Sequence, residues 1–302
     1  TLTIGSKEQA FDLSQENGVT EYGHILSIID LADGSSSLTK KYSTTHDAYG
    51  NYCFIKSMLV KGDVLLLGGT FNAKLAFDQN IDAVSTNDLY VAVLNKNTLD
   101  VNNAVASKVN EGDANSKKEE FGGMTVCGDY VYMMVQNQHY ILRSNYDRVN
   151  KRLTTPYIVC GQPGQADYKD LAGTKARLNK PGQGVFVFNK EYEDANKEDC
   201  YDFYFTDRNN HCIRKLTPDG VVSTFAGRGS TGMNVHANGY VDGHLRDEAR
   251  FNYPYALAYD EDTETFYVGD VNNHRIRKIA LEKIPEATEE HPEESQPEEG
   301  EQ

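Results

Sequence analysis

The sequence predicts an all-β protein built from repeated four-stranded sheets, and three observations support this prediction. Asp-Arg-Asn-Asn-His-Cys-Ile-Arg-Lys at 207–215 returns as Asp-Val-Asn-Asn-His-Arg-Ile-Arg-Lys at 270–278. Short runs rich in Val, Ile, Tyr and Phe recur between clusters of Gly, Asn and Asp. No stretch keeps a helical period of apolar residues over several turns.

The repeat extends upstream, so its unit is a whole module. Ala-Arg-Leu-Asn-Lys-Pro at 176–181 matches Ala-Arg-Phe-Asn-Tyr-Pro at 249–254, and Tyr-Lys-Asp at 168–170 matches Tyr-Val-Asp at 240–242. A fainter copy is Asn-Gln-His-Tyr-Ile at 137–141. The interval from Pro to Asp is longer in the earlier of the two strong copies, so we predict that 189–199 is an inserted polar hairpin loop.

Each well-marked module contains four predicted strands, of which the second is apolar on nearly every residue. That pattern is expected for a sheet packed between neighbours on both faces. The predicted strands are 24–31, 38–45, 52–60, 64–69, 89–94, 130–135, 140–144, 156–160, 185–188, 201–206, 212–216, 221–225, 255–259, 266–269 and 275–281. Radial stacking covers both faces of such sheets, so we predict a β-propeller of five to six four-stranded blades over 1–284.

The two ends of the chain carry separate predictions. The last module lacks a fourth strand, and 2–5 is predicted to supply it and close the ring. Residues 285–302 contain eight Glu and no Lys or Arg, so this acidic tail is predicted to be disordered.

Several motifs together resemble the NHL repeat. They are Phe-Ala-Gly at 225–227, Gly-Tyr-Val-Asp-Gly at 239–243, Ala-Arg-Phe-Asn-Tyr-Pro at 249–254 and Asp-x-x-Asn-His-Arg-Ile at 270–276. The resemblance is clearest over 161–282. With Tyr-x-Asp-Gly, the pattern is similar to NHL propellers of Bacteroidetes surface or periplasmic proteins, which often follow an immunoglobulin-like TIG domain. This implies a periplasmic or cell-surface location, and the start at Thr1 leads us to expect that a leader or upstream domain is missing.

A polar residue that occurs once per module is interpreted as structural. The turn residues of this kind are Asp207, Asn210 and His211, with their copies Asp270, Asn273 and His274. The Asp is expected to accept from a backbone N–H two residues on, and the Asn pair to adopt the positive φ of the turn. A calcium loop would need a glycine and a distal glutamate that are missing, so we predict neither metal nor cofactor.

Candidate ligand-binding residues lie around the start of the predicted innermost strands. They are Arg177, Lys180, Gln183, Arg250, Tyr253 and Tyr255. Lys180 and Gln183 differ in type from the residues of the next module, as expected of functional loops on a rigid scaffold. The two arginines repeat, so scaffold ion pairs remain the alternative for them. The 19 tyrosines could offer platforms for sugar rings or peptides, or simply pack within strands.

Charge and composition exclude several classes of function. The net charge is −15 with no cationic cluster, which argues against a nucleic-acid partner. No apolar run is long enough to span a membrane. The five cysteines show no Cys-x-x-Cys spacing, which argues against a zinc knuckle or a complete disulfide framework.

No catalytic motif stands out in the sequence, which favours a non-catalytic propeller that binds a glycan or a protein at one mouth of the ring. The alternative is a metal-dependent propeller enzyme, a lactonase-like or lyase-like hydrolase. His139, His211 and His274 are spaced as ring ligands could be, but their shared repeat position predicts the outer half of each blade.

Overall fold

The structure is a computed structural model that describes residues 2–4, 7–9, 22–33, 35–44, 52–83, 87–107, 109, 119–195, 199–229 and 237–280. These residues are mainly antiparallel strands, with a single short α-helix among them. No helix in these ranges is long and apolar enough to cross a membrane. The predicted tail 285–302 lies outside the described residues.

Four antiparallel sheets form the body. The first sheet is β5 (Cys53–Lys61), β6 (Val64–Phe71), β9 (Asp88–Asn95) and β10 (Val101–Ala106). The second is β11 (Phe121–Cys127), β12 (Tyr130–Val135), β13 (Tyr140–Asp147) and β15 (Tyr157–Gly161), with β14 (Arg152–Leu153) also paired to β13. The third is β16 (Pro181–Phe188), β17 (Tyr201–Asp207), β18 (Cys212–Leu216) and β19 (Val222–Ala226). The fourth is β20 (Pro254–Asp260), β21 (Thr265–Asp270) and β22 (Arg275–Ile279).

Smaller elements surround these sheets. Three hairpins pair β1 (Leu2–Ile4) with β2 (Lys7–Gln9), β3 (Tyr22–Ile29) with β4 (Ser36–Thr44), and β7 (Lys74–Leu75) with β8 (Asp78–Asp82). The helices are α1 (Lys190–Asp194) and the 3-10 turns η1 (Gln136–Gln138), η2 (Gly173–Lys175), η3 (Arg208–Asn210) and η4 (Val271–Asn273).

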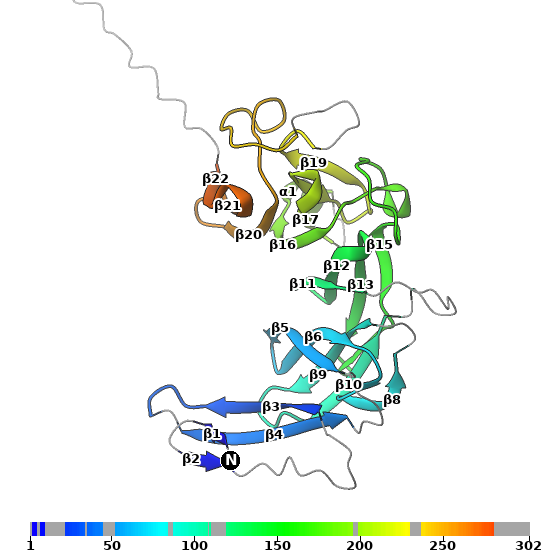
Figure 1. Ribbon diagram of the computed structural model, residues 1–302, viewed down its shortest axis with the longest axis vertical. Coiled ribbons are helices and arrows are strands. Elements are labelled where there is room, and N and C mark those ends of the chain that lie inside the picture. The colour runs from blue at the N-terminus through cyan, green and yellow to red at the C-terminus, as the bar shows by residue number, and fades with distance from the viewer. Residues whose placement is uncertain are drawn as a thin grey trace, which may run out of the picture.

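The four sheets follow one another along an arc, with β5, β11, β16 and β20 on its concave side (Figure 1). These inner strands lie against one another from sheet to sheet, β5 with β11, β11 with β16 and β16 with β20. Sheets that radiate from an axis lined by their first strands have the arrangement of propeller blades. The predicted all-β class is therefore confirmed, while the number of blades stays a prediction.

Apolar cores fill the spaces between successive sheets. Leu66 and Val91 of the first sheet share a core with Met133 of the second. Ile141 of the second sheet shares one with Phe203 of the third. Every residue of β6 is buried, as predicted for a strand covered on both faces.

The predicted strands are present, but two longer strands were missed. These are β10 and the inner strand β11. The start of β11 contains Gly122 and Gly123, which are typical of a turn. Here they allow close approach instead, because a Cβ on Gly122 would lie 2.8 Å from the carbonyl oxygen of Pro181.

Two further expectations need correction. Leu2–Ile4 pairs with Lys7–Gln9 and not with β22, so the predicted closure by 2–5 is wrong. The inserted segment at 189–199 does join two paired strands, but it contains the helix α1. Asn189 begins this helix by accepting a hydrogen bond from the N–H of Glu191 at 3.0 Å.

Candidate ligand-binding cavity

The repeated aspartate lies fully buried at the end of the second strand of its sheet. Asp207 Oδ1 accepts from the backbone N–H of Asn179 at 2.7 Å, and its Oδ2 accepts from the side chain of Asn210 at 2.8 Å and from Arg214 at 2.6 Å. The aspartate therefore holds the segment that leads into the inner strand β16. The prediction that Asp207 accepts a hydrogen bond from a backbone N–H two residues on is wrong.

The second copy repeats these contacts. Asp270 Oδ1 accepts from the N–H of Asn252 at 2.7 Å, and Oδ2 accepts from Asn273 at 2.7 Å and from Arg277 at 3.0 Å. The positive φ of the turn falls on His274 (53°) in this copy and on the matching histidine in the other. The expectation that the Asn pair adopts positive φ is therefore also wrong.

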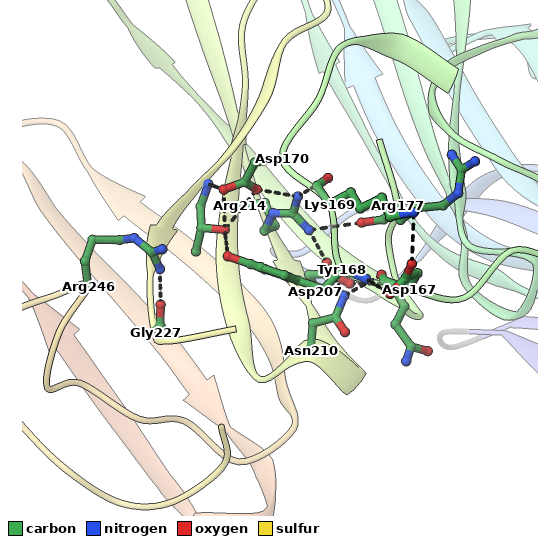
Figure 2. Close-up of polar contacts among 12 residues, drawn as sticks. Asp167, Tyr168, Lys169, Asp170, Arg177, Asp207, Asn210, Arg214, Gly227 and Arg246 are labelled. Atoms are coloured by element: carbon green, nitrogen blue, oxygen red, sulfur yellow. Dashed lines mark hydrogen bonds and ion pairs between the residues drawn. The ribbon is translucent and has the colours of Figure 1, made fainter. Parts of the chain in front are cut away.

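The fully buried Arg214 connects the aspartate to the link between the second and third sheets (Figure 2). Its guanidinium donates to Asp170 at 2.6 Å and to the carbonyl of Lys169 at 2.9 Å, and it lies 4.9 Å from the centre of the Tyr168 ring. Burial favours the neutral form, but the two carboxylates outweigh it and raise the pKa of Arg214. Arg277 makes the matching contacts with Asp242 and the Tyr240 ring.

The repeated histidines connect neighbouring sheets. His139 Nδ1 accepts from the backbone N–H of Lys180 at 3.1 Å, and His211 Nδ1 accepts from that of Tyr253 at 3.2 Å. Lys180 and Tyr253 immediately precede inner strands and have positive φ values of 60° and 57°. Each of these two histidines thus holds the backbone at the start of the next inner strand.

The four inner strands line an open cavity of about 500 Å³, which we call the axial cavity. Its lining residues are Lys56, Ser57, Phe121, Gly122, Gly123, Met124, Thr125, Met134, Gln183, Gly184, Tyr255 and Leu257. Cavities of this size accommodate small ligands.

A second cavity of about 380 Å³, the side pocket, lies between the first and second sheets and shares Lys56 and Phe121 with the axial cavity. Its lining residues are Tyr52, Phe54, Lys56, Thr70, Asn87, Glu120, Phe121 and Gln136. The Tyr52 and Phe54 rings stack with their centres 4.7 Å apart. The ammonium of Lys56 lies 5.2 Å from the centre of the Phe54 ring.

The structure brings some of the predicted binding residues together. Gln183 and Tyr255 line the axial cavity. Tyr253 is not among its lining residues, but the Arg208 guanidinium lies 5.6 Å from the centre of the Tyr253 ring and 5.8 Å from that of the Tyr255 ring. Lys180 immediately precedes β16, and the carbonyl oxygen of Lys180 accepts from the N–H of Arg208 at 3.3 Å.

The two predicted arginines do not line either cavity. Arg177 donates to backbone carbonyls of its own loop and extends away from Asp207 and Arg214 (Figure 2). Arg250 occupies the matching place in the next module, where its backbone oxygen accepts from Arg277 at 3.0 Å.

Tyr255 and two buried donors determine the polarity of the cavities. The Tyr255 hydroxyl donates to the carbonyl of Gly122 at 3.0 Å. Burial raises the pKa of Tyr255, and this effect outweighs the charge of Arg208, which lowers it. Gln136 Nε2 and Arg208 Nε are buried and have no hydrogen-bond partner. Both atoms are therefore donors that a ligand could satisfy.

Sequence reasoning missed most of the cavity lining, including Tyr52, Lys56, Phe121 and Gln136, and it missed Arg208, which lies beside Tyr255. The first three lie where the repeat is unmarked. Gln136 and Arg208 each stand three positions before a repeated histidine. They differ in type although their positions repeat, and this difference could have identified them as candidate binding residues.

In the part of the chain that the structure describes, no three side chains of His, Cys, Asp or Glu group as metal ligands would. All five cysteines are free, which agrees with the prediction that they form no disulfide framework.

Comparison with known proteins gives matches to solved structures alone, since no protein-family model and no curated protein matches the chain. An auxiliary nutrient binding protein from Bacteroides ovatus is 40% identical with a TM-score of 0.54, over 65% of this chain and 46% of that one. Another auxiliary nutrient binding protein, from Bacteroides thetaiotaomicron, is 36% identical with a TM-score of 0.55, over 80% of this chain and 63% of that one. A third structure, a proposed phosphatase from the same species, is 30% identical with a TM-score of 0.54, over 76% of this chain and 60% of that one. The chain thus matches between 46% and 63% of the length of these proteins.

Replacing Asp270 with Ala should lower the free energy of unfolding by about 3 kcal/mol, because it leaves a buried guanidinium without one of its carboxylates. Urea denaturation followed by circular dichroism measures this. The control is Asp262→Ala at an exposed position, which should change stability by less than about 0.5 kcal/mol. If Asp270→Ala lowered the free energy of unfolding by less than about 1 kcal/mol, the structural role of the buried Asp270 carboxylate would be contradicted.

The His211 contact predicts a pH dependence. Burial lowers the pKa of His211, so its neutral form stabilises the fold above the unfolded value of about 6.5, and this contribution is lost as pH falls through the folded pKa. Asn tolerates positive φ and offers an acceptor, so His211→Asn should show a smaller loss of unfolding free energy between pH 7.5 and 5. His244→Asn, at an exposed position, is the control. If the pH dependence of stability were the same in His211→Asn as in the parent, the stabilising role of neutral His211 would be refuted.

Proposed function

We propose that this protein is a non-catalytic binding propeller of NHL type that recognises a glycan through the axial cavity and the side pocket. The observation that carries the proposal is that four inner strands contribute aromatic, amide and backbone polar groups to one open cavity. Pockets that combine apolar surface with a few placed polar groups are typical ligand sites.

The side chains in these cavities suit a sugar better than an apolar ligand. Tyr52, Phe54 and Tyr255 contribute aromatic rings to the cavity walls, and such rings can pack against the C–H face of a pyranose. Gln183 is exposed, and Gln136 adds an amide group for hydroxyls. The similarity to two auxiliary nutrient binding proteins of Bacteroides supports a binding role. A periplasmic or cell-surface location is part of the proposal, because nutrient glycans are met there.

Replacing Tyr255 with Ala should reduce glycan retention at least tenfold, because it removes the ring that closes one wall of the axial cavity. A glycan microarray identifies the bound glycan, and titration calorimetry measures its affinity for the parent and the variant. Tyr267→Ala, on an exposed ring of β21, the middle strand of the fourth sheet, is the matched control and should bind as the parent does. Equal binding by Tyr255→Ala, or retention of a protein partner and no glycan, would reject the proposal.

The alternative is a metal-dependent propeller enzyme, and the similarity to a proposed phosphatase keeps it worth testing. Elemental analysis of protein purified without chelator should find less than 0.1 equivalent of zinc or calcium, an order-of-magnitude threshold for a site that holds no ion. One equivalent that survives dialysis would favour the enzyme.

A further inference from the structure

The side chains around the cavities differ at places where the backbone repeats. We define the rim as the residue before each inner strand and the residue after each second strand. The four rim pairs are Tyr52 and Asn72, Glu120 and Gln136, Lys180 and Arg208, and Tyr253 and Val271. In the first three pairs, the second residue donates its backbone N–H to the carbonyl of the first, at 3.1, 2.8 and 3.3 Å. The backbone is thus equivalent in these three pairs, and the rim side chains can differ and so determine what binds.

Positive charge dominates the rim although the chain as a whole carries −15. Lys180 and Arg208 are cationic, and Lys56 adds a third cation on the wall shared by both cavities. Glu120 is the acidic rim residue. In the third and fourth sheets, the aspartates behind the rim do not offset these charges, because Asp207 and Asp270 are buried against Arg214 and Arg277. A local excess of positive charge attracts anions.

Donor groups at the cavities lack acceptors. Gln136 lines the side pocket and the Arg208 guanidinium lies beside Tyr255. Gln136 Nε2 and Arg208 Nε are buried and have no hydrogen-bond partner. Lys56 forms no ion pair with any residue that the structure describes. A buried donor without an acceptor is unfavourable, so a ligand that brings acceptor oxygens gains affinity.

Building on the proposed function, we infer that the ligand is an anionic saccharide. One sugar ring packs on the stacked Tyr52 and Phe54 side chains, and its acidic group accepts hydrogen bonds from Lys56 and Gln136 in the side pocket. The axial cavity continues from Lys56 and Phe121 to Tyr255, so the next unit of an oligosaccharide contacts Tyr255, beside which the Arg208 guanidinium lies. Glu120 accepts hydrogen bonds from neutral hydroxyls at the open side of the pocket.

The test uses a glycan microarray of uronic-acid oligosaccharides, their carboxyl-reduced neutral counterparts and sulfated oligosaccharides, followed by titration calorimetry of the best pair. The full chain should retain an acidic member at least tenfold more tightly than its neutral counterpart. Lys56→Gln should weaken acidic binding about fivefold with little effect on neutral binding, and Glu120→Gln should strengthen it. Raising NaCl from 0.05 to 0.5 M should weaken acidic binding alone.

Lys175→Gln, at an exposed position in η2, is the charge-matched control and should leave both affinities unchanged. Preference for a uronate or for a sulfate supports the inference and identifies the acidic group. Equal binding of acidic and neutral members, still lost in Tyr255→Ala, would overturn the inference and leave the proposed function intact. Retention of neither kind would overturn both.

Discussion

The buried aspartate–arginine pair is the interaction on which the later sheets depend. In the third sheet, Asp207 and Arg214 together hold the end of the second strand, the start of the inner strand at Asn179 and the link that carries Asp170. A buried ion pair of this kind gives little net stability, but breaking it leaves an uncompensated charge. It therefore specifies one geometry for the module. The fourth sheet repeats the arrangement, so the two sheets present their inner strands in the same way.

The cavity results from how closely those inner strands approach the axis. A Cβ on Gly182 would lie 2.5 Å from Thr206 Oγ1, which itself donates to the carbonyl of Tyr255 at 2.9 Å. Glycine at this place lets β16 and β20 meet, and it positions the Tyr255 ring over the cavity. Close packing of four strands leaves an open cavity whose walls come from residues far apart in the sequence.

The strands were predictable because each sheet is covered on both faces, which requires apolar runs of strand length between turn residues. The inner strand β11 escaped detection because Gly122 and Gly123 satisfy a steric requirement that no local pattern records. The role of Asp207 was misjudged for a related reason. Its partners at Asn179 and Arg214 are separated from it by a chain reversal, whereas sequence reasoning considered only the nearest backbone groups.

What the sequence by itself determined is the module: its strands, its repeated turn and the places where residue type varies, because these follow from local pattern and from comparison of copies. The tertiary structure decided which variable residues share a cavity. Gln183 and Tyr255 meet Lys56 in the axial cavity, and Lys56 also meets Gln136 in the side pocket, whereas Arg177 lies elsewhere. The physical reason is that contact across the axis depends on the radial arrangement of whole sheets, to which residues distant along the chain contribute together.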